Sequence, residues 1–243
     1  MTTITRTTAP PQTSRDSLRR TALVAGICYL ITFVASIPAL PLYSNLVGDP
    51  KYILGSGSSA GVLLGGLLEV ITALAGIGTA VVLFPVVKRQ SEWLALGFVT
   101  SRVIEGAYLV VGVIAILSVV TLRENPVAGT DPAALITAQQ SLVAIHDWSF
   151  LLGPGVMPGV NALLLGTLLY RSGLVPRLIP LIGLVGAPFF LVSAVALIFG
   201  AYAQLSLPSG IATVPIFIWE LSLGLWLTFK GFKPSPITQV PNE

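Results

Sequence analysis

Residues 94–122 read LALGFVTSRVIEGAYLVVGVIAILSVVTL, and Arg102 and Glu105 are the only charged residues in this run. About 20 apolar residues in a helix cross about 30 Å of bilayer hydrocarbon, so the run predicts a membrane-spanning helix. A charge inside such a helix is costly, and it normally faces a protein interior or a water-filled cavity and has a partner. Arg102 and Glu105 are three residues apart and share one helix face.

The composition of the whole chain is also typical of a membrane protein. Of its 243 residues, 54% are hydrophobic and only 9% are charged, whereas a soluble domain carries about 25% charged residues. No polar segment is long enough to form a separate soluble domain. The sequence pI is about 9.2, but the basic residues are scattered through short segments, so we expect no nucleic-acid partner.

Six apolar runs predict an all-α bundle of six transmembrane helices within a domain of residues 19–232. The runs cover approximately residues 21–42, 60–87, 94–122, 147–170, 176–201 and 211–229. The first run is longer than the apolar core of a signal peptide, so we expect it to be retained. Residues 1–18 are rich in Thr, Ser and Pro and predict a disordered tail, and residues 233–243 form a C-terminal tail. Pro132 could start a further helix within the connection 123–146.

The distribution of Lys and Arg predicts how the chain is oriented in the bilayer. Six spans place both termini and the second and fourth connections on one side. Ten basic residues lie on that side, and two, Lys51 and Arg123, lie on the other. Because basic residues accumulate in cytoplasmic segments, we expect a multi-pass protein of the cell membrane with both termini in the cytoplasm. The ten are Arg6, Arg15, Arg19, Arg20, Lys88, Arg89, Arg171, Arg177, Lys230 and Lys233.

Three glutamates are expected near the middle of the bilayer. With a rise of about 1.5 Å per residue, Glu69, Glu105 and Glu220 reach similar depths, within about 5 Å, and Asn161 reaches about the level of Arg102. Glu69 shares its helix face with small residues that allow another helix to approach, so it should point at protein and not at lipid.

Two interpretations of these polar groups remain open. They form either a buried network that only ties helices together, or a site for a ligand or an ion in a cavity. Arg102 can compensate one of the three carboxylates. Burial and neighbouring like charges both disfavour an ionised carboxylate. We therefore expect that at least one glutamate is protonated at neutral pH, or that a cation enters.

The fourth run contains residues that disfavour a continuous helix. Gly153-Pro154-Gly155 and Pro158-Gly159 predict a kink or a break. A broken membrane helix is tolerated where the freed carbonyl groups line a cavity or meet protein partners. Discontinuous helices also occur at transporter binding sites. The simpler alternative is a kink that serves packing alone.

His146, the only histidine, is followed by Asp147 at the start of the fourth run. These residues could be an acid–base pair, metal ligands or a helix cap, and a cap is the favoured interpretation. A lone histidine argues against a polyhistidine zinc hydrolase. The sequence has no nucleophile elbow, Walker loop or His-Glu-x-x-His motif. We therefore expect no metal or cofactor and do not favour an enzyme.

Several segments together resemble a known family. They are SRVIE at residues 101–105, HDWSFLLGP at 146–154, LYRSGLVPR at 169–177 and WELSLGLW at 219–226. At these spacings the chain resembles, from about Arg19 to Phe232, the bacterial family called domain of unknown function 4386 (DUF4386). The resemblance implies a six-helix protein of the bacterial inner membrane. It implies no activity, substrate or catalytic residue, and Glu69 lies outside the matched segments.

These observations leave three hypotheses of function. The first is binding or transport of a small ligand or ion at a site drawn from Arg102, Glu105, Glu69, Glu220, Asn161, His146 and Asp147. The second is an intramembrane enzyme that uses His146 and Asp147, and the third is a structural or interaction protein. A water-accessible cavity that joins the three glutamates would favour the first hypothesis. A carboxylate of another helix within hydrogen-bond reach of His146 would favour the second, and a dry, fully paired network the third. The sequence predicts no oligomeric state.

Overall fold

A computed structural model describes residues 12–126 and 129–238. Within these ranges the chain is helical and contains no strand. The two short 3-10 helices are η1 (Tyr52–Leu54) and η2 (Pro236–Thr238). The α-helices are α1 (Gln12–Leu42), α2 (Ser44–Gly48), α3 (Ala60–Val87), α4 (Glu92–Glu124), α5 (Pro132–Leu152), α6 (Met157–Ser172), α7 (Leu178–Ile198) and α8 (Leu207–Phe229).

Six helical segments of the described chain are long and apolar enough to cross a membrane. They are α1 from Asp16 onward, α3, α4, the α5–α6 pair, α7 and α8. The prediction of an all-α bundle with six spans is therefore confirmed. Part of the segment that was predicted to be a disordered tail, residues 1–18, is helical, because residues 12–18 belong to α1. Residues 1–11 lie outside the described chain.

The fourth span is two helices, as its glycines and prolines indicate. α5 ends at Leu152 and α6 begins at Met157, with turns between them. A Cβ atom at Gly153 would lie 2.6 Å from Cβ of Tyr108, so the glycine lets the break approach α4. α5 begins at Pro132, and the side chain of Asp131 caps it by accepting a hydrogen bond from the Ala133 amide at 3.1 Å.

The expected capping role of His146 and Asp147 is wrong. Both residues lie well inside α5, where backbone amides already donate to carbonyl groups of the preceding turn. The helix continues upstream to Pro132 through a less apolar stretch, and the true cap is Asp131. An aspartate at the border of an apolar run resembles a cap, but here it lies inside the helix and not at its start.

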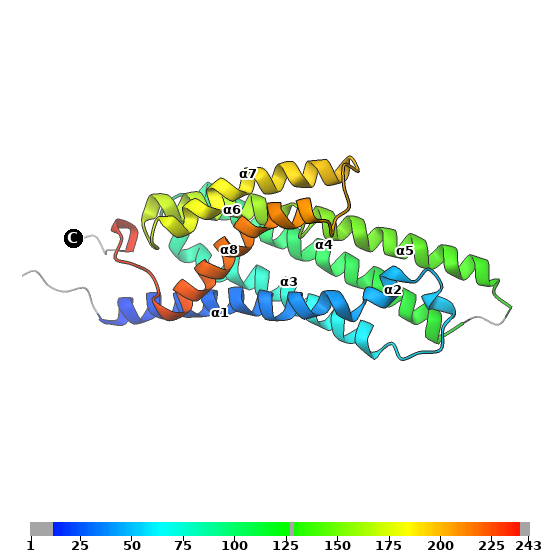
Figure 1. The fold of residues 1–243 in the computed structure, drawn as a ribbon. Helices are drawn as coiled ribbons and strands as arrows, with labels where there is room; N and C mark the ends of the chain where they lie inside the picture. Colours follow the sequence, from blue (N-terminus) through cyan, green and yellow to red (C-terminus); the bar gives the residue numbers. More distant parts are fainter. Residues whose placement is uncertain (1–11, 127–128, 239–243) are drawn as a thin grey trace, which may run out of the picture.

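The six spans form a closed ring in chain order (Figure 1). α1 packs on α3, α3 on α4, α4 on α5 and α6, α6 on α7, α7 on α8, and α8 returns to α1. α4 and α8 consequently lie across the ring from each other. The start of α1 and the short helix η2 are at the same end of the bundle, which we call the terminal end (Figure 1). The connection between α7 and α8 is directed towards the opposite, far end.

The terminal half of the ring is filled by a packed core. Its large buried side chains include Leu83, Phe98, Leu165, Trp219 and Leu227, from four different helices. A tight crossing of α1 and α8 closes this half, because a Cβ atom at Gly26 would lie 2.5 Å from the backbone nitrogen of Thr228. At the C-terminal end of the described chain, Lys233 donates a backbone hydrogen bond to Leu174 at 2.7 Å.

A second, smaller core lies towards the far end. It joins the end of α1, α2 and η1 to α3 and α4 through side chains such as Tyr43, Leu46, Ile53, Ile116 and Val119. This core does not reach α7 or α8. The far half of the ring is therefore packed on the α1–α3–α4 side and less filled towards α7 and α8.

Candidate functional site

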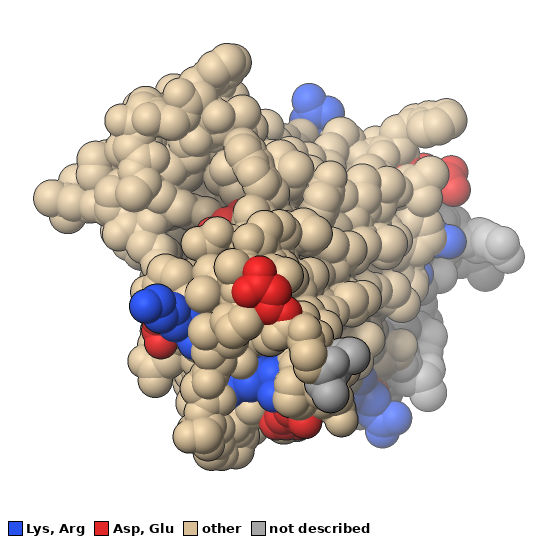
Figure 2. Space-filling model, turned by 90° about the vertical axis from the view of Figure 1, so that its right-hand side faces the viewer, with Lys and Arg blue, Asp and Glu red and all other residues tan. Residues whose placement is uncertain are grey.

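A cavity of about 640 Å³ lies inside the ring, on the far side of the packed core. Residues of every span contribute to its wall, and the connection between α7 and α8 lines it through Gln204, Leu205 and Ser206. Figure 2 looks onto the far end of the molecule and shows a hollow with acidic side-chain atoms inside it. The polar side chains in the wall include Glu69, Glu105 and Glu220. One cavity therefore joins the three glutamates.

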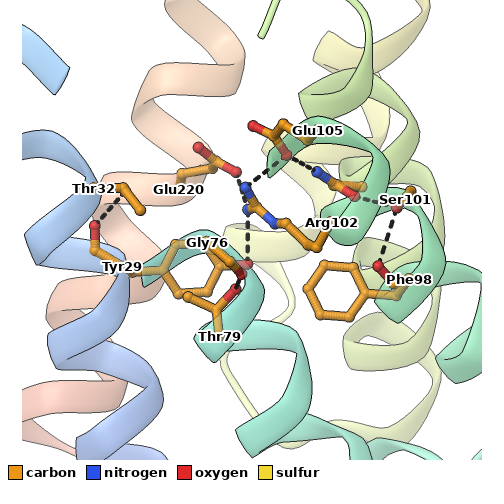
Figure 3. A network of polar contacts seen from close by, with 10 residues as sticks. Tyr29, Thr32, Gly76, Thr79, Phe98, Ser101, Arg102, Glu105 and Glu220 are labelled. Atoms are coloured by element: carbon orange, nitrogen blue, oxygen red, sulfur yellow. Dashed lines mark hydrogen bonds and ion pairs between the residues drawn. The ribbon is translucent and has the colours of Figure 1, made fainter. Parts of the chain in front are cut away.

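Arg102 of α4 is the centre of the polar network in the cavity wall (Figure 3). Its Nη1 donates to Oε2 of Glu105 at 3.1 Å, and its Nη2 donates to Oε1 of Glu220 on α8. Nη2 also donates to the hydroxyl of Tyr29 on α1 at 3.3 Å. The side chain of Arg102 is only 4% exposed, and its guanidinium lies over the rings of Tyr29 and Phe98. One cation thus holds together α1, α4 and α8.

Asn161 extends this network to α6. Its Nδ2 donates to Oε2 of Glu105 at 2.7 Å, and its Oδ1 accepts a hydrogen bond from the hydroxyl of Ser101. Asn161 is 1% exposed and lies one turn after the break in the fourth span, so the break places the start of α6 beside α4. Both polar atoms of the amide are paired, which fixes the orientation of the Glu105 carboxylate.

Glu69 of α3 lies in the same cavity wall but does not contact Arg102. The hydroxyl of Tyr43 donates to its Oε1 at 2.5 Å, and its side chain is buried, with the residue 4% exposed. Burial and the nearby Glu69 carboxylate raise the pKa of the Tyr43 hydroxyl, so Tyr43 keeps its proton and acts as the donor. Glu69 is therefore held by a neutral hydroxyl, whereas Glu105 and Glu220 are held by a cation.

His146 and Asp147 do not belong to the Arg102 network. The ring of His146 packs edge-on against Tyr43, with ring centroids 5.3 Å apart. Its Nδ1 lies 3.2 Å from a carboxylate oxygen of Asp147, and its Nε2 is buried without a hydrogen-bond partner. The Asp147 side chain is 52% exposed and faces a small groove beside Gln139. Within the described chain, His146 has no carboxylate of another helix in hydrogen-bond reach.

The structure adds Tyr29, Tyr43 and Ser101 to the residues that the sequence singled out. Tyr29 carried an available signal, because a tyrosine in the middle of an apolar span needs a partner for its hydroxyl. Tyr43 lies just beyond the end of α1, where an interfacial tyrosine is common and points to nothing specific. Serines occur widely at helix contacts in membranes, so Ser101 could not have been distinguished.

Across residues 24–231 the sequence matches the family described as Domain of unknown function (DUF4386). The chain belongs to the DUF4386 family. The matched region runs from within α1 to just past the end of α8 and contains each residue of the Arg102 network. The comparisons with curated proteins and with solved structures gave no match. The chemistry of this DUF4386 protein must therefore be inferred from the cavity itself.

Proposed function

We propose that this DUF4386 protein binds a small ligand in the cavity, at the cluster formed by Arg102, Glu105 and Glu220, with Glu69 of the adjacent helix α3 in the same wall. The observation that carries the proposal is the single cavity of about 640 Å³ that joins all three carboxylates. Cavities of about 300–1,000 Å³ with a few polar groups in a mostly apolar wall are typical of small-molecule sites. A network that only held helices together would need no such space beside it.

The packing on the two sides of the cavity supports entry from one direction. On the terminal side lies the packed core, which includes Phe98 and Trp219. On the far side the wall is formed by the loop residues Gln204, Leu205 and Ser206. A ligand therefore enters from the far end. Transport would need a second state that opens through the core, and a change in glutamate protonation is a candidate coupling step for it.

An intramembrane enzyme is the weaker alternative. His146 and Asp147 are adjacent in α5, and neither residue lines the cavity. Among the described residues, no group of three His, Cys, Asp or Glu side chains is suited to hold a metal ion. A general acid–base reaction would need one of these residues within about 3 Å of the substrate, and the geometry does not favour it.

We also propose how the protein is oriented in the cell membrane. The terminal end carries the basic residues Lys88, Arg89 and Arg177 in two short connections and Arg171 in the last turn of α6, and such residues accumulate on the cytoplasmic side. We place the termini in the cytoplasm and the mouth of the cavity on the opposite face of the cell membrane. The protein would then take its ligand from outside the cytoplasm or from the outer leaflet.

Mass spectrometry of the purified protein tests the proposal. The protein, released intact from the membrane, should retain a defined small molecule that is depleted in Glu105→Gln. Thr213 lines the cavity, so Thr213→Trp should also deplete the molecule by filling the space. Val192 is 70% exposed on α7 and does not line the cavity, and Val192→Trp should retain it. Equal retention by all four proteins would contradict a ligand site in this cavity.

A further inference from the structure

We propose that the ligand is an organic ammonium ion with an apolar body, and this inference rests on the binding function proposed above. Its ammonium group would lie in the part of the cavity that Glu69, Glu105 and Glu220 line. Its apolar body would lie along the phenylalanines that line the remaining wall. The inference follows from the charges, the unpaired acceptors and the aromatic side chains of the wall.

The charges of the wall favour a cation. Among the described residues, Arg102 is the only basic one that lines the cavity, and it faces two carboxylates, while Glu69 supplies a third. The two Nη atoms of Arg102 are already engaged with Glu105, Glu220 and Tyr29. Its Nε has no partner but is sealed within the protein, so an anionic ligand would have to displace one of these carboxylates from the Nη atoms. A cation needs no displacement, because it adds a partner to carboxylates that share a single positive charge.

Each of the three glutamates keeps one unused oxygen. Arg102 and Asn161 both donate to Oε2 of Glu105, Arg102 donates to Oε1 of Glu220, and Tyr43 donates to Oε1 of Glu69. Among the described residues, no group donates to the other oxygen of any of the three. None of these oxygens is sealed within the protein. In Figure 3 the free oxygens of Glu105 and Glu220 point away from the guanidinium.

Glu69 is the observation that separates this site from a simple cluster of acidic residues. It is more than nine-tenths buried, it lines the cavity, and one of its oxygens has no donor among the described residues. That oxygen is not sealed within the protein, so a donor of a ligand in the cavity can reach it. An ammonium group carries up to three N–H donors and no acceptor, which suits the free oxygens of this wall.

Four phenylalanines belong to the apolar part of the wall, together with aliphatic side chains such as Leu109 and Leu197. The phenylalanines are Phe33, Phe150, Phe190 and Phe217, from α1, α5, α7 and α8. Phe33 and Phe217 form an edge-to-face pair with ring centroids 5.0 Å apart, and Phe217 is one helical turn from Glu220. Aromatic faces next to carboxylates are the groups that bind ammonium ions, because both attract a cation and the rings also bury its apolar substituents.

An inorganic metal ion fits these groups less well. No three His, Cys, Asp or Glu side chains in the described chain are grouped to coordinate one. A metal ion would also fill only a small part of the cavity, whose volume is about 640 Å³. The mixture of acidic and aromatic side chains is instead suited to a molecule with one charged end and one apolar end.

The experiment compares three probes with the same apolar body and different end groups: phenylbutylamine, phenylbutanol and phenylbutyrate. Binding to the full-length protein in nanodiscs is measured by calorimetry, and empty nanodiscs provide the background. We expect saturable binding of the amine, at least about tenfold tighter than that of the alcohol, and no binding of the carboxylate. Glu220→Gln and Glu69→Gln should each weaken binding of the amine and leave binding of the alcohol unchanged. Ser222→Ala, on the same helix but outside the wall, is the control.

The outcomes separate this inference from the binding function beneath it. If the alcohol or the carboxylate binds as tightly as the amine, the ammonium assignment is overturned, while the cavity still binds ligands. If the amine binds equally well to Glu220→Gln, to Glu69→Gln and to the control, the glutamates do not recognise the charge and the inference is also overturned. If no probe binds and the purified protein retains no small molecule, the proposed function fails as well.

Discussion

Arg102 of α4 and Glu220 of α8 form an ion pair across the ring, between two helices that are not neighbours in the order of the spans. The same guanidinium holds Glu105 and Tyr29. The pair therefore spans the ring where the packed core ends and the cavity begins. It ties opposite helices together on one side and presents carboxylate oxygens to the cavity on the other.

Removal of Arg102 should destabilise the protein. Arg102→Leu leaves Glu105 and Glu220 side by side in the bundle without a countercharge, and loss of one partner of a buried ion pair costs about 3–5 kcal/mol. The expected result is a clear decrease in the melting temperature of the purified protein. Arg171 is exposed at the terminal end, so Arg171→Leu should change little. Equal melting temperatures for the two variants would refute the role of Arg102 as the centre of the network.

The crossing of α1 and α8 should be sensitive to a single methyl group. Gly26→Ala would bring a Cβ atom within 2.5 Å of the Thr228 backbone nitrogen, and overpacking of this kind costs about 1–3 kcal/mol. Gly210 in α8 has open space at the Cβ position, and Gly210→Ala should stabilise its helix by up to about 1 kcal/mol. Thermal unfolding of both variants measures the difference. A stable Gly26→Ala variant would mean that α1 and α8 are farther apart.

Much of this architecture is accessible from the sequence because bilayer dimensions constrain it. Runs of apolar residues predict the six spans, and Gly153-Pro154-Gly155 predicts the break, since proline removes a backbone donor wherever it stands in a helix. The shared face of Arg102 and Glu105 follows from helix geometry. The position of Asn161 near Arg102 follows from counting residues along straight helices.

The pairing within the network is not accessible in this way. Nothing local distinguishes Glu220, which binds Arg102, from Glu69, which binds Tyr43. That choice depends on how the helices are ordered around the ring, which is set by packing across the whole bundle. At Asp147 a local signal was present but misleading. The residue matched a capping pattern, although the helix that contains it begins at Pro132. The cavity itself is a property of assembled helices and has no signature in any one of them.

The orientation of the protein can be tested with single cysteines. Cys28 is the only cysteine, so Cys28→Ser provides a background without thiols. In this background we expect Lys51→Cys to react with a membrane-impermeant maleimide in cells with an opened outer membrane and an intact inner membrane. Lys88→Cys should react only after lysis, because we expect that connection to be cytoplasmic. The reverse pattern would mean that the mouth of the cavity opens to the cytoplasm.

The accessibility of Thr72 tests the central claim most directly. Thr72 lies in the cavity wall one turn after Glu69, whereas the adjacent Ile71 is 37% exposed on α3 and does not line the cavity. In the Cys28→Ser background, the rate of modification by water-soluble methanethiosulfonates is measured for Thr72→Cys and Ile71→Cys. A cavity that admits ligands predicts that Thr72→Cys reacts, that its reaction is faster with a cationic reagent than with an anionic one, and that Ile71→Cys in lipid stays unmodified. An unreactive Thr72→Cys would contradict a water-accessible binding cavity.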